Sequence, residues 1–184
     1  MTDNPKRLAI REQVQNLIKA AGIKHFSVDE VLVHTASTNK AGVTNRMPLV
    51  HLIYNCIPTL IVLDALRAEL GCPVVLTSGY REPEYNRTLD PPGAERSQHV
   101  DFRAFDFKAM AGTPKDWAKK LENMRGKPFA CPMMLAVQPG VGPFRPELLR
   151  INNTLQGSAF IFHGGIGVYN TFCHVDTRGI DVSW

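Results

Sequence analysis

The sequence has no apolar run that approaches the roughly 20 residues needed to cross a lipid bilayer, so we expect no membrane insertion. Its first residues, MTDNPKRLAIREQVQ, include basic side chains but no apolar segment behind them. This pattern predicts that a secretory signal peptide is absent. Any route out of the cell would then differ from the usual signal-peptide pathway.

The sequence also lacks cysteine pairs with the C-x-x-C spacing. Its four cysteines lie beside apolar residues or proline, which predicts buried free thiols at Cys56, Cys72, Cys131 and Cys173. Lysine and arginine give a net charge of +4, but they are scattered and form neither a basic block nor a stripe with aromatic residues. We therefore expect no direct binding to nucleic acid.

What is present indicates one soluble α+β domain that spans residues 1–184. The 44% of hydrophobic and 21% of charged residues are typical of a globular protein. Apolar residues at helical spacing predict three helices, over 5–21, 49–70 and 113–124. The first belongs to an N-terminal helical segment 1–24, and Pro58 should interrupt the second. Short apolar or alternating segments predict strands over 73–78, 102–108, 166–169 and 172–177, the last two forming a hairpin.

Prolines crowd the segment 127–162, and we expect an irregular backbone there. Five of them occur between positions 128 and 146. Long connections of this kind in a compact domain are usually functional lids, interaction surfaces or mobile segments. We therefore interpret 127–162 as a proline-rich insertion or lid.

Three residues have the types and positions of a zinc site. His99 precedes the predicted strand that contains Asp106, and His174 lies on the last predicted strand. Asp176 shares a face of that strand with His174, whereas Cys173 points the other way and is a poor ligand candidate. Two histidines and a carboxylate suit Zn²⁺ with one open position. The spacing alone also fits histidines that are hydrogen-bonded in the core.

Several spaced motifs resemble the signature of the zinc D-alanyl-D-alanine peptidase family. They are SGYR at 78–81, Asn86, Gly93 with Ala94, Ser97-x-His99 and Ala104-x-Asp106, followed by GGIGVY at 164–169 and FCHVDTR at 172–178. The ending is similar to the carboxypeptidase branch, and small murein endopeptidases share the core. The resemblance covers about 25–110 and 160–184. It implies an α+β fold with a small antiparallel sheet flanked by helices, hedgehog/D-Ala-D-Ala-peptidase-like.

The resemblance implies roles for individual residues. His99, Asp106 and His174 match the three zinc ligands. Arg81 matches an arginine beside the substrate, where a guanidinium binds a carboxylate or the developing oxyanion. Ser97 matches a serine that positions the substrate or the residues around the metal. From the residues alone, Arg81 could equally be a surface arginine in a loop.

The sequence offers more than one candidate for the general base, the residue that accepts a proton from the attacking water. Several branches of the family place a glutamate three residues before the third ligand, but this position is Thr171 here. Asp176 is our candidate for the base, and a partner that orients His174 is the equal alternative. His163 is the second candidate for the base, and Tyr169 could assist as a donor.

Phe102 is a second departure from the family pattern. It occupies a position between the histidine and the aspartate where the family usually has glycine. Glycine allows a close turn of the backbone. We expect the aromatic ring either to narrow the substrate pocket or to reflect a different local bend.

The resemblance implies a zinc peptidase that acts as a carboxypeptidase or endopeptidase on peptidoglycan peptides, such as a phage-associated cell-wall lysin. The alternative is a zinc-binding structural or binding protein of a phage particle with little or no turnover. A third reading is an α+β binding domain without zinc. From the habits of the family we expect a protein that is virion-associated or released on lysis, and otherwise cytoplasmic.

Overall fold

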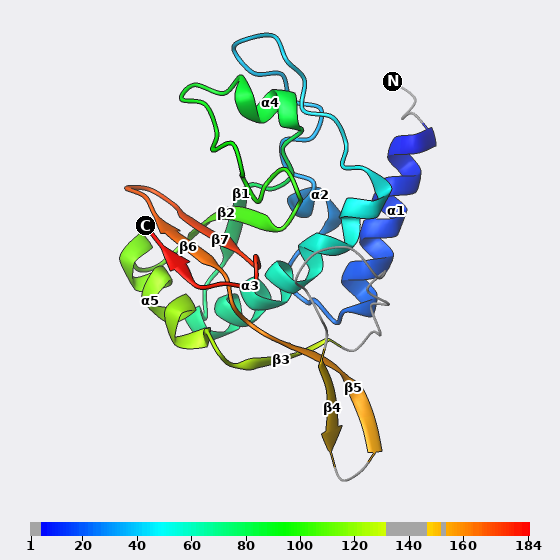
Figure 1. Cartoon of the computed structure of the whole chain (residues 1–184), viewed down its shortest axis with the longest axis vertical. Helices are drawn as coiled ribbons and strands as arrows, with labels where there is room; N and C mark the ends of the chain where they lie inside the picture. Colours follow the sequence, from blue (N-terminus) through cyan, green and yellow to red (C-terminus); the bar gives the residue numbers. More distant parts are fainter. Residues whose placement is uncertain (1–4, 132–146, 152–153) are drawn as a thin grey trace.

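A five-stranded sheet forms the centre of the molecule (Figure 1). The computed structural model describes residues 5–131, 147–151 and 154–184. The strand order in this sheet is β1-β2-β7-β6-β8. Neighbouring strands are antiparallel, except that β8 runs parallel to β6. The strands are β1 Val74–Ser78, β2 Ala104–Ala109, β6 Gly165–Val168, β7 Cys173–Asp176 and β8 Val182–Ser183.

Helices pack around this sheet, and the predicted α+β class is confirmed. The main core helix α3 contacts β2, and α5 contacts β6 and β7. Thr113 caps α5 through reciprocal hydrogen bonds with Asp116, so the helix begins where the predicted helix 113–124 begins. The short α4 lies between the predicted strands 73–78 and 102–108, where no helix was predicted. The helices are α1 Pro5–Ala20, α2 Val28–Val31, α3 Cys56–Leu70, α4 Pro83–Arg87 and α5 Pro114–Met124.

The apolar stretch Val50–Leu70 is the longest helical segment that the structure describes, and it is interrupted as predicted. A 3₁₀ helix, η1 Val50–Asn55, precedes α3, so Pro58 falls in the first turn of α3, where its missing N–H breaks no helical bond. By length and composition this segment could cross a membrane, contrary to the sequence expectation. Half of it is buried inside the protein, and its buried apolar residues belong to the hydrophobic core.

A second, three-stranded sheet corrects the prediction of irregular backbone over 127–162. Its strands are β3 Pro128–Cys131, β4 Glu147–Ile151 and β5 Thr154–Ile161, in the order β3-β5-β4. Figure 1 shows this sheet extending from one end of the molecule. Pro128 is the first residue of its strand, a position that tolerates proline. Residues 132–146 lie outside the described part, and the role of the segment as a lid stays a prediction.

Alternation along β7 separates a helix-facing side of the central sheet from the side that bears the site. The Cys173 thiol donates to the carbonyl of Pro114 at the start of α5, over 2.9 Å. Burial raises the pKa of this thiol to about 12. His174 and Asp176 therefore point away from α5. The prediction that Cys173 faces away from His174 is confirmed. Cys56, Cys131 and Cys173 are buried and belong to no disulfide, whereas Cys72 is partly exposed, so its predicted burial is wrong.

Candidate metal centre

Asp106 and His174 lie directly opposite each other on the paired strands β2 and β7. Nδ1 of His174 is 2.9 Å from Oδ1 of Asp106. Both side chains are buried. The register of two neighbouring strands thus brings together residues that are 68 positions apart in the sequence.

His99 reaches the same carboxylate oxygen from the loop that precedes β2. Its Nε2 lies 3.2 Å from Oδ1 of Asp106. Its Nδ1 is 2.7 Å from the carbonyl oxygen of Gly79 and must carry the proton, because a carbonyl only accepts. The backbone carbonyl of His99 accepts from the amides of Arg81 and Phe102, so the loop itself is fixed.

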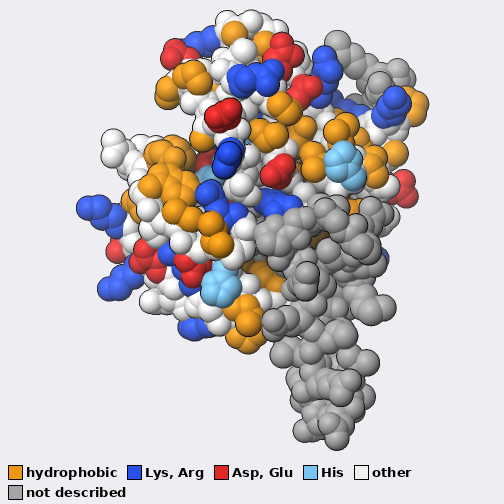
Figure 2. Space-filling model, viewed as in Figure 1, with side chains coloured by type: hydrophobic (Ala, Val, Ile, Leu, Met, Phe, Trp, Pro, Cys, Tyr) orange, Lys and Arg blue, Asp and Glu red, His pale blue; other side chains and the backbone are white. Residues whose placement is uncertain are grey.

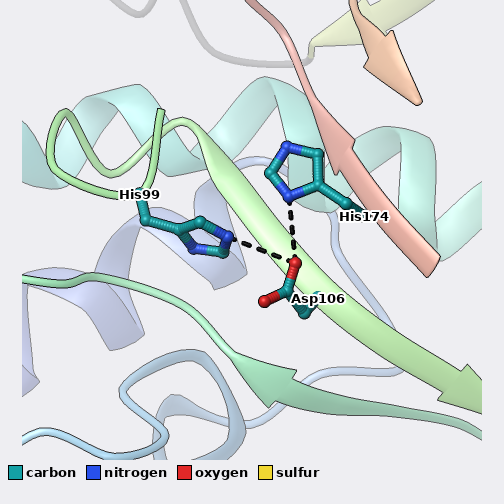
Figure 3. Close-up of side chains that lie close together, drawn as sticks. All are labelled: His99, Asp106 and His174. Carbon is teal, nitrogen blue, oxygen red and sulfur yellow. Dashed lines mark hydrogen bonds and ion pairs between the residues drawn. The ribbon is translucent and has the colours of Figure 1, made fainter. Parts of the chain in front are cut away.

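The three side chains converge on one point (Figure 3) and form the only candidate metal cluster among the described residues. One ligand atom from each lies within 4.8 Å of the others. The distances of 3.2 and 2.9 Å to Oδ1 of Asp106 compare with about 3.3 Å between ligands of a tetrahedral ion with bonds of roughly 2.0–2.1 Å. Two imidazoles and one carboxylate are a ligand set suited to zinc with one position open.

Hydrogen bonding explains why a cation suits this point. Gly79 fixes the proton of His99 on Nδ1, so in the neutral ring the lone pair of Nε2 faces Asp106. The Asp176 carboxylate accepts from Nε2 of His174 over 3.0 Å, which leaves Nδ1 of that ring toward Asp106. With both rings neutral, two nitrogen lone pairs face one carboxylate oxygen, and a bound cation or an added proton relieves their repulsion.

The pKa values follow from this burial and charge. Burial lowers the pKa of His99 and outweighs the attraction of Asp106, which favours a neutral ligand. For His174, burial acts in the same direction, but the bonds to Asp106 and Asp176 raise the pKa above its usual value. Burial would raise the pKa of Asp106, yet the two imidazoles hold it well below the usual range. The carboxylate is therefore available to a metal.

Arg81 binds the second oxygen of Asp106. Its Nη2 donates to Oδ2 of Asp106 over 2.5 Å, and its Nε donates to the Ser78 hydroxyl over 2.9 Å. The guanidinium therefore lies beside the metal cluster, as the resemblance implied, and it neutralises charge on the ligand. Ser78 and Arg81 close the turn that also carries Gly79, so the SGYR motif supports both His99 and Asp106.

Asp176 is completely buried and all its bonds are internal. Besides His174, it accepts from the backbone amides of Gly165 and Arg178, over 3.0 and 3.1 Å. The Arg178 guanidinium binds both of its oxygens, with Nη2 2.6 Å from Oδ2 and Nε 2.9 Å from Oδ1. Burial would raise the pKa of Asp176, but these donors and His174 lower it. This is the geometry of a partner that orients His174.

Phe102 adopts the backbone conformation that glycine favours. Its φ is +55°, in the left-handed region, and its side chain is completely buried. The ring packs edge-on against Tyr80 at 5.7 Å and tilted against Phe105 at 5.8 Å between centroids. The ring is part of the core. The glycine-like φ gives no support to the alternative of a different local bend, and the narrowing of the substrate pocket stays a prediction.

The other predicted residues lie near the cluster or apart from it. The Ser97 hydroxyl accepts from the amide of His99 over 3.4 Å, within the ligand loop. His163 instead pairs with Asp181, Nδ1 to Oδ2 at 3.0 Å, and its side chain is 44% exposed. Tyr169 is exposed at the end of β6 and stacks on Phe172 with centroids 4.3 Å apart.

Sequence reasoning missed Asn45, which fixes the SGYR turn from a distant loop. It is fully buried. Its Nδ2 donates to the carbonyls of Tyr80 and His34, over 2.8 and 3.2 Å, and its Oδ1 accepts from the amide of Glu82 over 2.9 Å. A lone asparagine in a polar loop gives no signal of this role. Trp184 near the site was also missed, and Arg178 was quoted in the FCHVDTR motif without a role.

Asn86 and Gly93 belong to the quoted motifs, and the structure gives them a packing role. Nδ2 of Asn86 donates to the carbonyl of Ala94 over 3.0 Å, and the amide of Gly93 donates to the carbonyl of Asn86 over 2.9 Å. A Cβ on Gly93 would lie 2.1 Å from Oδ1 of Asn86. A side chain on Gly93 would therefore collide with the buried Asn86 side chain and displace it.

Comparison with known proteins agrees with the cluster. The sequence model of the family described as Peptidase M15 matches residues 24–135, which is more than half of the chain. The match includes His99 and Asp106 and ends before His174. No curated protein matches the chain, and no solved structure matches it.

Proposed function

Because the chain belongs to the Peptidase M15 family, whose members are zinc-dependent, we propose that this zinc metallopeptidase hydrolyses peptide bonds in the stem peptides or cross-links of peptidoglycan. The observation that carries the zinc chemistry is the buried convergence of His99, Asp106 and His174. The motif order of the zinc D-alanyl-D-alanine peptidases supports the cell-wall substrate.

The chain's residues hold and orient the reacting groups. Bound zinc would polarise the scissile carbonyl and activate a water molecule. The two bonds from Arg81 to Ser78 and Asp106 use two of the five N–H donors of the guanidinium. We propose that its other donors bind a substrate carboxylate or the developing oxyanion. Ser97, in the same loop as His99, is proposed to position the substrate.

The presence or absence of a general base distinguishes an enzyme with turnover from a protein that only binds zinc. Both oxygens of Asp176 are bonded inside the protein, and His163 pairs with Asp181. We therefore assign Asp176 to orienting His174 rather than to the base. This observation favours a second candidate function, a zinc-binding structural or binding protein of a phage particle with little turnover.

Digestion of purified peptidoglycan, followed by separation of the released muropeptides, tests the first function. We expect cleavage that a zinc chelator and His99→Ala both abolish, while His51→Ala, an exposed histidine on η1, leaves it intact. Cleavage that persists after chelation and in His99→Ala would overturn the proposal. Chelated protein should regain activity when zinc is supplied.

The second function makes a different prediction. It requires about one zinc per chain, tight assembly with a phage structural protein, and no hydrolysis of any muropeptide. Thr171→Glu supplies the carboxylate that several branches of the family carry. Hydrolysis that arises in Thr171→Glu and is absent in the natural sequence would support the binding role.

A further inference from the structure

Trp184 packs against the metal ligand His174. The centroids of the two rings are 5.2 Å apart, and their planes are inclined by 46°. Nothing in the family match reaches this residue, which lies beyond residue 135. Figure 2 shows hydrophobic side chains gathered over the β6–β7 hairpin and the C-terminal end of the chain, where Val168, Tyr169 and Trp184 are exposed.

The indole is held in place by contacts on several sides. Its Nε1 donates to the Tyr169 hydroxyl over 3.0 Å. The backbone amide of Trp184 donates to the carbonyl of Ile166 over 3.2 Å, and the Trp184 carbonyl accepts from the amide of Val168 over 2.8 Å. These bonds extend the parallel pairing of β8 with β6. The indole is therefore fixed although 47% of Trp184 is exposed.

Gly167 makes room for this ring. A Cβ on Gly167 would lie 2.7 Å from Cε2 and Nε1 of Trp184, closer than packed atoms approach. The glycine in β6 thus admits the indole against the sheet beside His174. Any larger residue would displace the ring.

Arg125 anchors the backbone that leads into Trp184. Its Nη2 donates to the carbonyls of Val182 and Gly164, over 2.5 and 2.7 Å. Its Nη1 donates to the Ser183 hydroxyl over 2.9 Å. The strand that presents the indole is thereby tied to the end of α5.

The contacts of Trp184 belong to a closed circuit, which here means a ring of pairwise contacts that runs from Trp184 through Arg178 and Asp176 to His174 and back to Trp184. The Arg178 guanidinium carbon lies 5.4 Å from the centroid of the indole, in cation–π geometry. The same guanidinium binds Asp176, and Asp176 accepts from Nε2 of His174. His174 in turn packs on Trp184. Each member of the circuit is therefore restrained from two sides.

We propose that Trp184 is a positioning residue that fixes the plane of the His174 imidazole. Hydrogen bonds at Nδ1 and Nε2 and the covalent link to Cβ set the position of the ring, but the hydrogen bonds tolerate a range of angles and so permit small turns of the ring plane. The lone pair of Nδ1 lies in the ring plane, so such a turn misdirects it from the metal. Ligand geometry must be kept within about 10–20° by packing and by outer partners. The indole face supplies that packing.

The test measures zinc binding rather than turnover, so its failure is distinct from failure of the proposed peptidase activity. Full-length Trp184→Ala should bind zinc about 10–100-fold more weakly in chelator competition, the usual cost of losing an outer partner. The absorption spectrum of the cobalt-substituted protein should change, because it reports the ligand geometry. Trp184→Phe, which keeps an aromatic face, should recover most of the affinity.

Two further variants make the result decisive. Gly167→Ala displaces the indole without removing it and should reproduce the Trp184→Ala defect. Tyr54→Ala removes a similarly exposed aromatic residue from η1, with 49% exposed, and should leave zinc affinity and the cobalt spectrum unchanged. Natural affinity and spectrum in Trp184→Ala and Gly167→Ala, even with reduced stability, would overturn the proposal. If Trp184→Ala does not fold, the zinc affinities and cobalt spectra of Gly167→Ala and Trp184→Phe test the proposal in its place.

Discussion

Asp106 and His174 are cross-strand neighbours whose side chains meet at 2.9 Å on the face of the sheet opposite α5. Such directly opposed residues have Cβ atoms only about 4.5–5.5 Å apart, so the strand register alone brings two metal ligands together. His99 then needs only a fixed loop to complete the cluster. The site is therefore built mainly by the pairing of β2 with β7.

Asp106→Asn should weaken zinc binding by more than the roughly 10–100-fold that loss of an outer partner costs. The substitution removes the negative charge that both imidazoles and Arg81 face. Chelator competition measures the affinity. Asp101→Asn, an exposed aspartate in the preceding loop, is the matched control and should bind zinc normally.

Asp176→Asn separates the two roles considered for this residue. If the carboxylate orients His174, its loss should weaken zinc binding by about 10–100-fold. As a general base, its loss would lower kcat and leave zinc affinity intact. We expect the first result, since both oxygens are bonded internally. Unchanged affinity together with lost turnover would restore the base assignment.

Phe102→Gly should destabilise the protein even though glycine suits the local φ of +55°. Relief of the left-handed backbone contributes about 1–2 kcal/mol, whereas loss of a buried phenylalanine costs about 3–5 kcal/mol. The expected net loss in the free energy of unfolding is about 2 kcal/mol, measured by urea denaturation. A glycine variant as stable as the natural protein would show that the ring contributes little packing.

Asn45→Ala should lower the free energy of unfolding by about 1–3 kcal/mol, because it leaves buried backbone groups of Tyr80 and Glu82 without their partner. It should also weaken zinc binding through the displaced Arg81 turn. Asn55→Ala is the control, since Asn55 is partly exposed and makes one bond, to the Asp101 carbonyl. Normal zinc affinity in Asn45→Ala would show that the Arg81 turn does not need Asn45 to support the metal ligands.

Asp116→Asn should lower stability at neutral pH and not in strong acid. Hydrogen bonds from Thr113 depress the pKa of the Asp116 carboxyl below its usual 3.8. Its contribution is therefore present above that unfolded value and is lost as the pH falls through the folded pKa. Thermal unfolding of both proteins across pH 2–7 should give curves that converge at the acid end. A constant difference would contradict this origin.

The sequence predicted the ligand strands well because their side chains alternate strictly. Cys173 and Val175 are apolar and face α5, so His174 and Asp176 had to share the opposite face. The second sheet was missed because proline was interpreted as excluding strands, although Pro128 stands at a strand start. Arg178 was quoted in a motif without a role, and its contacts with Asp176 are local. Trp184 was missed because an aromatic residue beyond a strand is typical of surfaces, and only its folded pairing with β6 brings it to His174.

The 68 positions between Asp106 and His174 have a consequence for the growing chain. A ribosome-bound chain that has emerged only as far as β2 offers two of the three ligands and no paired β7. The complete ligand set therefore exists only once β7 has paired with β2, so the appearance of metal binding during refolding would report the formation of this one strand pair.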